Sequence, residues 1–233
     1  MINIESENNI YGNAKLDKFL LSTLISNHMD SLVKRLPELS FCRKECERAF
    51  TILRDCYASG GKVLICGNGG SASDAEHIVG ELMKSFLKHR KIKHEDAEAI
   101  QRAFPEDADY LVEHLQGALP AISLSSQLSI LTAFSNDVAA DMAFAQQTYG
   151  YLQLNDVLIG LSTSGNSLNV INAVRVAKSL GIHTIALTGR SGGRLDSISD
   201  VTIKAPADAT CQIQEYHLSI YHTLCAMLEE EFF

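Results

Sequence analysis

Residues 62–82 read KVLICGNGGSASDAEHIVGEL, which is a short apolar run, a glycine-rich turn and a helical pattern in succession. The apolar run predicts a buried β-strand, and the pattern from Asp74 onward predicts a helix. Further apolar runs, each beside a turn or a helical pattern, occur at 120–124, 156–161, 183–188 and 200–204. Short strands that alternate with helices predict parallel strands joined by right-handed crossovers. The predicted fold class is therefore α/β, a doubly wound sheet of five parallel strands.

The amino-terminal part of the chain has a different pattern. Residues 14–59 carry apolar side chains at helical spacing, and Pro37 divides them into two stretches. One predicted apolar face consists of Leu16, Phe19, Leu20, Thr23 and Leu24. We therefore expect an amino-terminal pair of helices before the sheet.

Residues 87–119 interrupt the alternation of strands and helices. Their apolar spacing predicts two short helices, the second of which begins at Pro105. This helical insertion is either a hairpin packed on the surface or a lid or subunit contact near the functional site. We expect the extension, the insertion and the sheet to form one domain that spans residues 1–233.

Charge and composition exclude several classes of protein. The formal net charge of -8 gives no general attraction for nucleic acid, so an anionic ligand must be held by a local site. No stretch reaches the roughly 18 apolar residues that a membrane span needs. The first residues lack the basic and apolar regions of a signal peptide, and the six cysteines show no CxxC spacing. We expect reduced thiols, a cytoplasmic protein, and neither nucleic-acid nor membrane partners.

Two turns rich in Gly, Ser and Asn follow predicted strands, at residues 67–73 and 162–167. Ligands of doubly wound sheets bind beyond the carboxyl ends of strands, and helix amino termini there attract anions. Neither turn has the G-x-x-x-x-G-K-[ST] or the G-x-G-x-x-G spacing. Hydroxyls without a lysine favour a phosphate monoester over a triphosphate with magnesium. The alternative interpretation is that these Ser and Asn residues merely cap helices.

Polar residues on two predicted helices complete a candidate site. His77 and Glu81 lie four residues apart, so they share one helix face about 6 Å apart along the axis. The last helix, otherwise apolar, contains Gln214, Glu215, His217 and His222. Polar groups in a buried helix need partners, so we expect an acid–base or metal site between the two helices. Gln214 and His222 are about 12 Å apart along a continuous helix. One ion could bind both only if the two side chains lean toward each other, or if the ligands come from two subunits.

Together, several segments of the chain resemble the sugar isomerase (SIS) domain family and, within it, the bacterial sedoheptulose-7-phosphate isomerases. These segments are the opening stretch at 62–82, FSND at 134–137, DVLIGLSTSGNSLNVINAV, ALTGRSGGRL and IQEYHLSIYH. Where this family commonly has Gly-Arg after the Glu-Leu pair, this chain has Lys84-Ser85. The resemblance implies a small sugar phosphate as the partner, and a homotetramer whose active sites lie at subunit interfaces and recruit the amino-terminal helices.

The resemblance also implies roles for particular residues. The sugar site would contain Asn68, Gly69, Gly70, Ser71 and Glu81, with further substrate contacts from Asn136, Asp137 and Gln214. The phosphate would be held by Ser162, Thr163, Ser164 and Ser167. A zinc ion, one per subunit, would be bound by His77, Glu81, Gln214 and His222.

The implied reaction converts sedoheptulose 7-phosphate to D-glycero-D-manno-heptose 7-phosphate through an enediolate, the first step toward nucleotide-activated heptose for lipopolysaccharide or capsule. It needs a base, an acid and a grip on the far end of the substrate. Our hypothesis is that Glu81 removes the proton, and that His222 protonates either the substrate oxygen or the adjacent carbon. Two alternatives remain, an isomerase of another phosphosugar and a non-catalytic SIS module that senses a sugar phosphate or binds a protein.

Overall fold

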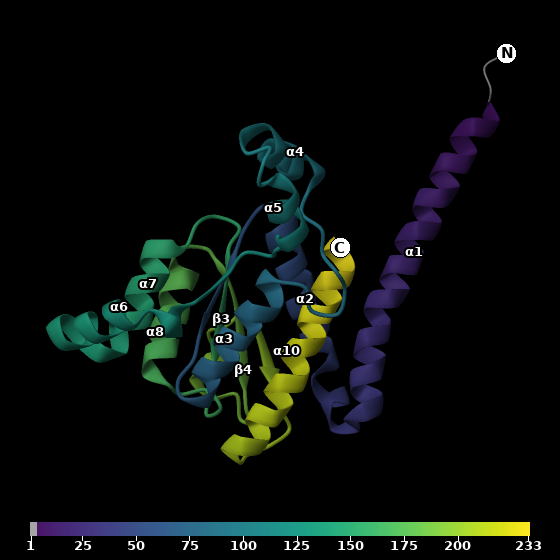
Figure 1. Cartoon of the computed structure of the whole chain (residues 1–233). Coiled ribbons are helices and arrows are strands. Elements are labelled where there is room, and N and C mark those ends of the chain that lie inside the picture. The colour runs from purple at the N-terminus through teal and green to yellow at the C-terminus, as the bar shows by residue number, and fades with distance from the viewer. Residues whose placement is uncertain (1–3) are drawn as a thin grey trace.

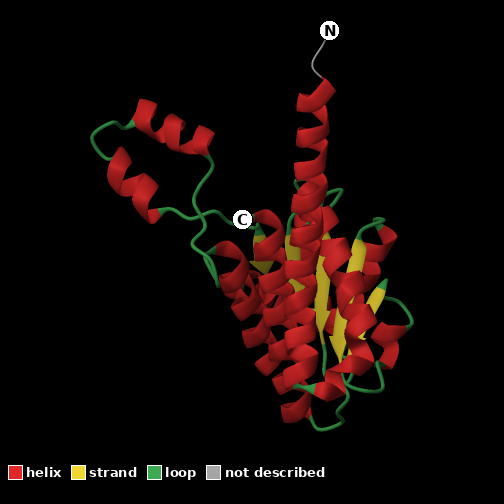
Figure 2. Ribbon diagram, turned by 90° about the vertical axis from the view of Figure 1, so that its right-hand side faces the viewer, coloured by secondary structure: helices red, strands yellow, loops and turns green. Residues whose placement is uncertain are grey.

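The structure is a computed structural model that describes the backbone of residues 4–233 and the side chains of residues 20–233. Its centre is a single sheet of parallel strands in the order β2-β1-β3-β4-β5 (Figures 1 and 2). The strands are β1 (Val63–Cys66), β2 (Ala121–Ser123), β3 (Val157–Leu161), β4 (His183–Thr188) and β5 (Val201–Lys204). All five lie within the predicted runs, so the predicted α/β class and the parallel sheet are confirmed.

Helices account for most of the remaining described residues. They are α1 (Ile4–Arg35), α2 (Arg43–Ala58), α3 (Gly70–Met83), α4 (His94–Ala103), α5 (Ala108–His114), α6 (Leu128–Phe134), α7 (Ala143–Tyr151), α8 (Leu168–Ser179), α9 (Gly193–Asp196) and α10 (Thr210–Phe232). Short 3-10 helices are η1 (Pro37–Cys42), η2 (Leu124–Ser126) and η4 (Ala140–Met142), and η3 (Ser135–Ala139) is a π-helix. Among the described residues, no helix is long and apolar enough to cross a membrane.

The sheet is buried on both faces, as expected for strands read as continuous apolar runs. Because side chains alternate along a strand, Ile65 and Ile159 face one core, which also contains apolar side chains of α2, α3 and α10. Leu64 and Leu158 face a second core with α7 and α8. Helices on both faces make the sheet doubly wound.

The amino-terminal helices α1 and α2 form as predicted, with Pro37 at the start of η1 between them. The predicted apolar face of α1 differs from the buried one. Leu20 and Leu24 are 50% and 47% exposed, and Thr23 is exposed too. The buried face consists of Ile25, Met29 and Leu32. Leu16 and Phe19 lie outside the described side chains. Periodicity identifies an amphipathic helix, but the residues that touch the core depend on how the helix is rotated against α2 and α10.

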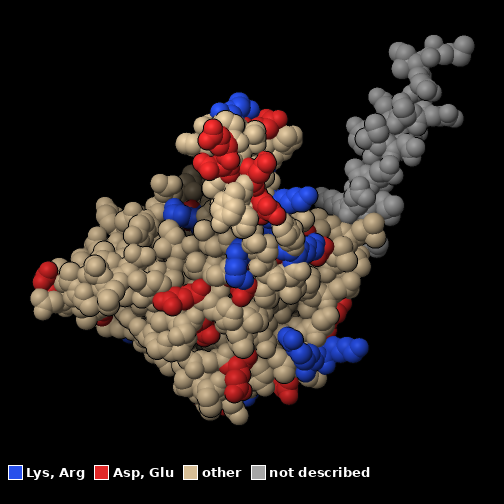
Figure 3. All heavy atoms as spheres, in the orientation of Figure 1, with Lys and Arg blue, Asp and Glu red and all other residues tan. Residues whose placement is uncertain are grey.

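The insertion contains the two expected helices, α4 and α5, which project from the body as a hairpin (Figure 2). The hairpin carries the acidic side chains seen over α4 and α5 in Figure 3. It leaves the end of α3 and leads to the amino end of β2, whereas the glycine-rich turns follow the carboxyl ends of strands. Because the amino and carboxyl ends of parallel strands lie on opposite sides of the sheet, the hairpin does not cover the turns of its own chain.

A buried ion pair anchors the start of this insertion. Arg90 and Glu229 are 0% and 1% exposed, and Arg90 Nε lies 2.6 Å from Glu229 Oε1. The other guanidinium nitrogens of Arg90 donate to the carbonyl oxygens of Leu82 and Glu81. Burial opposes the charge of Glu229, but the backbone N–H groups of Phe86 and Leu87 and the guanidinium keep its pKa below the ordinary value. The pair joins the end of α3 to α10.

Candidate active site

The two glycine- and serine-rich turns lie side by side. They follow β1 and β3, which are paired in register with Cys66 opposite Gly160. The strand order reverses between β1 and β3, so both turns stand at the switch point of the sheet. Two reciprocal amide hydrogen bonds of 2.9 and 2.8 Å join Asn68, in the first turn, to Asn169, at the start of α8. The sequence therefore predicted both turns, and the structure adds the pair that holds them together.

The first turn exposes backbone at the start of α3. Gly69 has a φ of 55°, a left-handed conformation that favours glycine, and the turn is tied to Ser125 through Gly67. Ser71 is buried, and its N–H donates to Asn68 O. An open pocket of about 240 Å³ borders the turn. Its lining includes Asn68, Gly69, Ser125, Ser135 and Asn169.

The second turn makes hydrogen bonds both within itself and to neighbouring segments. The hydroxyls of Ser162 and Ser167 lie 2.9 Å apart, and Ser162 is buried. Ser164 Oγ accepts from Asn166 N, and Asn166 Oδ1 accepts from the N–H of Arg194. Ser164 is exposed and Thr163 is partly exposed. The turn leads straight into α8, whose opening N–H groups and dipole suit an anion.

Asn136 and Asp137 belong to the π-helix η3, beside the pocket of the first turn. Both side chains are exposed, and Asn136 Nδ2 donates to Asp137 Oδ1 at 2.8 Å. The neighbouring Ser135 lines that pocket, while Asn136 and Asp137 are not part of its lining. The structure therefore places Ser135, but neither Asn136 nor Asp137, in the lining of this pocket.

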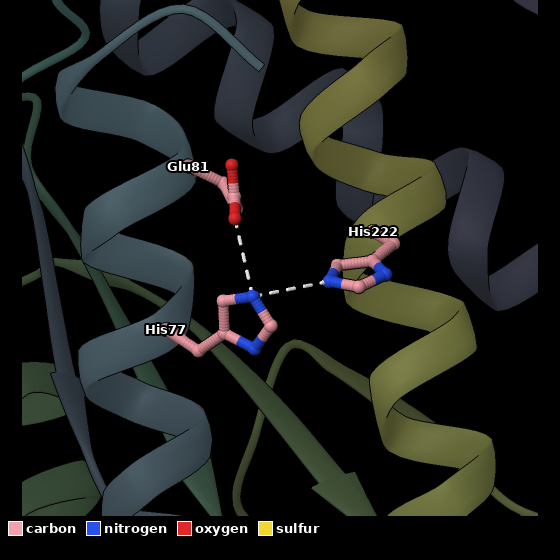
Figure 4. Close-up of side chains that lie close together, drawn as sticks. All are labelled: His77, Glu81 and His222. Carbon is pink, nitrogen blue, oxygen red and sulfur yellow. Dashed lines mark hydrogen bonds and ion pairs between the residues drawn. The ribbon is translucent and has the colours of Figure 1, made fainter. Parts of the chain in front are cut away.

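His77, Glu81 and His222 come together between α3 and α10 (Figure 4). One potential ligand atom from each lies within 4.8 Å of the others. His77 Nε2 is 3.1 Å from Glu81 Oε1 and 3.4 Å from His222 Nε2. Burial, followed by the charge of neighbouring His77, lowers the pKa of His222. Two imidazole nitrogens and one carboxylate oxygen form a donor set that suits zinc, and three protein ligands leave a position open.

Gln214 lies apart from these three residues. A Cβ at position 70 would overlap the side-chain amide of Gln214, so the glycine there makes room for it. His77 follows Gly70 by about 10 Å along the axis of α3. The expected four-residue ligand set is thus only partly assembled in one chain, because Gln214 faces the first turn while His222 faces His77.

Sequence reasoning missed several residues around this cluster. Tyr221 OH lies 2.9 Å from His77 Nδ1 and 3.2 Å from Asp74 Oδ1. Lys84 Nζ lies 3.2 Å from Glu81 Oε2, so the residue noted as a departure from the family contacts the candidate base. Asp74 stands one turn before His77 and could have been found by its spacing. Tyr221 carries no such signal, since a tyrosine in an apolar helix resembles core.

Comparisons with known proteins identify the family of this chain. The model of the SIS domain family matches residues 27–99 and 98–189. A probable phosphoheptose isomerase of Thermoplasma acidophilum is 41% identical over 180 residues, which are 77% of this chain and 85% of that protein. A phosphoheptose isomerase of Helicobacter pylori is 38% identical over 205 residues, 88% of this chain and 92% of that protein.

A solved structure is similar over nearly the whole chain. The phosphoheptose isomerase of Neisseria gonorrhoeae has a TM-score of 0.67 and 31% identity, and the match covers 90% of this chain and 98% of that one. The family model covers both turns and α3, and the relatives and the solved structure are similar over most of the chain. The chain belongs to the SIS domain family and, within it, to the phosphoheptose isomerases.

Proposed function

We propose that this protein is an aldose–ketose isomerase that converts sedoheptulose 7-phosphate to D-glycero-D-manno-heptose 7-phosphate. The observation that carries the proposal is the approach of Glu81, His77 and His222 to within 4.8 Å of one another. The names of the relatives support the same reaction. A module that only senses a sugar phosphate needs the turns but does not need a carboxylate and a second imidazole on either side of His77.

The two parts of the site suit the two ends of such a substrate. The turns at 67–73 and 162–167 would hold the phosphate and the sugar hydroxyls through backbone N–H groups, amides and hydroxyls. The cluster lies about 10 Å further along α3, where the reacting carbons would lie. Holding the far end of the substrate restricts its motion, which lowers the barrier of the proton transfer.

Glu81 is the proposed base and His222 the proposed acid. The two oxygens of Glu81 have different neighbours, since Oε1 faces His77 and Oε2 faces Lys84. Oε2 would take the proton from carbon, and the ammonium of Lys84 would stabilise the carboxylate before the transfer. His222, whose pKa lies below the ordinary value, would move a proton between the two substrate oxygens, and Glu81 would return its proton to the adjacent carbon, so that both groups are restored.

His77, Glu81 and His222 would hold a zinc ion, and the N and O donors fit it. When bound, zinc would polarise the substrate carbonyl as a Lewis acid. In this proposal, Gln214 contacts the substrate from the side of the first turn, and a role as ligand requires it to lean toward His222 or to come from a neighbouring subunit. Asn136 and Asp137 are proposed to contact substrate through the assembly rather than within one chain.

We also propose that the protein is a cytoplasmic homotetramer with interface active sites. The exposed Leu20 and Leu24 of α1 support burial of that helix face against another copy. All six cysteines are free, five of them buried, which suits a reducing compartment. Light scattering on the purified protein gives its mass, and a monomer would contradict this part of the proposal.

The test is an assay of aldose formation from sedoheptulose 7-phosphate, with and without a chelator. We expect turnover that the chelator removes and that added zinc restores. Glu81→Gln should abolish turnover while calorimetry still detects binding of the sugar phosphate. Glu95→Gln, on the exposed hairpin, is the matched control and should behave as the unmodified protein. Binding without turnover in the unmodified protein, with or without zinc, would favour the sensor.

A further inference from the structure

A chain of hydrogen bonds runs behind the His–Glu–His cluster, on the side of His77 away from Glu81. Tyr221 OH donates to Asp74 Oδ1 at 3.2 Å and lies 2.9 Å from His77 Nδ1. The chain joins α3 to α10, since Asp74 and His77 belong to the first and Tyr221 to the second. Tyr221 is 2% exposed and the His77 side chain is 43% exposed, so the phenol is the buried end of these contacts.

The chemistry of these groups decides where the protons lie. A phenol has one hydrogen to give, and an ionised carboxylate can only accept. Asp74 Oδ2 is buried and has no hydrogen-bond partner in the described part of the chain, so Tyr221 supplies the hydrogen bond that this carboxyl receives. A phenol keeps its proton at neutral pH, because its ordinary pKa is about 10. The phenol oxygen must then accept from His77, which places a proton on Nδ1.

We propose that Asp74 and Tyr221 are positioning residues that hold the proton of His77 on Nδ1 and so direct the Nε2 lone pair toward Glu81 and His222. The inference deepens the metal site of the proposed function and rests on it. Metal-binding histidines usually donate the second ring nitrogen to an acceptor that fixes the tautomer, and here a phenol backed by a carboxylate fills that role.

The opposite tautomer would give a different site. A proton on Nε2 would let His77 donate to Glu81 as an ordinary pair one turn apart on a helix. Nδ1 would then be an acceptor, and it would compete with Asp74 for the single hydrogen of Tyr221. With the proton on Nδ1, lone pairs of His77 and Glu81 face each other at 3.1 Å, an arrangement that a cation between them stabilises. The chain of hydrogen bonds therefore favours cation binding over a simple ion pair.

The experiment reads the tautomer directly in the metal-free full-length protein. At about pH 8, where ordinary histidines are neutral, imidazole ¹⁵N signals distinguish a protonated from an unprotonated ring nitrogen. Loss of one set of signals in His77→Gln assigns His77. Tyr221→Phe removes only the hydroxyl, and Tyr57→Phe is its matched control, because Tyr57 is also buried and its hydroxyl contacts Pro120 O away from the site. Zinc affinity is measured for each protein by competition with a chelating dye.

We expect the unmodified protein and Tyr57→Phe to carry the proton of His77 on Nδ1. Tyr221→Phe should shift it toward Nε2 and weaken zinc binding about 10- to 100-fold. A proton on Nε2 in the unmodified protein overturns the inference, even where Tyr221→Phe fails to fold. An unchanged tautomer and zinc affinity in a folded Tyr221→Phe overturn it too. Absence of isomerase turnover with the expected tautomer would refute the proposed function and leave this inference standing.

Discussion

Replacing Arg90 by methionine should destabilise the protein far more than the loss of any surface arginine. Arg90 is 0% exposed, and its Nε lies 2.6 Å from Glu229 Oε1. Its two other nitrogens donate to Leu82 O at 2.7 Å and Glu81 O at 2.9 Å. Methionine keeps much of the apolar volume, so Arg90→Met tests the hydrogen bonds and the charge rather than the packing.

The expected loss follows from what the substitution leaves behind. Removing one partner of a buried ion pair costs about 3–5 kcal/mol, because the other charge stays buried without compensation. Glu229 would still accept the backbone N–H groups of Phe86, Leu87 and Lys88. These three donors partly stabilise the buried carboxylate. We therefore expect a loss of unfolding free energy at the lower end of that range, about 3 kcal/mol.

Urea unfolding at fixed protein concentration measures the loss. The matched control is Arg43→Met, since Arg43 pairs with Asp30 and Glu47 on the surface. Exposed pairs contribute less than about 1 kcal/mol. If Arg90→Met lowers the unfolding free energy no more than Arg43→Met does, the buried pair does not anchor the insertion and this reasoning is refuted.

Two further predictions concern α10 and its contact with the first turn. Burial lowers the pKa of His217 from 6.5 to about 4 in the folded protein. Between these two pH values, His217 is therefore protonated in the unfolded chain but neutral in the folded one. The contribution of His217 to the unfolding free energy is therefore fully present above pH 6.5, and about 3 kcal/mol of it is lost as the pH drops to 4. His217→Asn should make the unfolding free energy, measured with urea, depend less steeply on pH in this range. An unchanged slope would contradict the prediction. Gly70→Ala should displace Gln214 and raise KM with little change in stability, while Gly80→Ala, where a Cβ meets nothing within 4 Å, should not. Equal KM values for the two alanine variants would argue against a substrate contact by Gln214.

The sequence was sufficient to predict the fold because each strand is buried on both faces. Runs such as VLIC and VLIGL have no polar face, so they mark central parallel strands without any knowledge of their neighbours. The turns could be predicted for a similar reason. Small and hydroxylated residues directly after a strand indicate an anion-binding turn from the local sequence alone, whatever the rest of the fold is.

Other features depend on contacts between distant segments, which a pattern does not contain. In the sequence, nothing distinguishes Asn169 from other polar residues at the start of a helix. Only the pairing of β1 with β3 places it beside Asn68. Arg90 belongs to a residue type that is almost always exposed, so its burial cannot be expected from sequence. Tyr221 acts on His77 only because α10 packs against α3.

The packing of α3 against α10 joins the two ends of the site. Gln214 faces Gly70, and two turns later Tyr221 and His222 face His77. Both helices therefore advance together from the first turn toward the cluster, and Figure 1 shows them side by side. A slip of α10 by one turn would remove Gln214 from the turn and His222 from His77 at once. A single helix–helix contact therefore sets both the place of Gln214 at the first turn and the approach of His222 to His77, and the Arg90–Glu229 pair holds the far end of that contact.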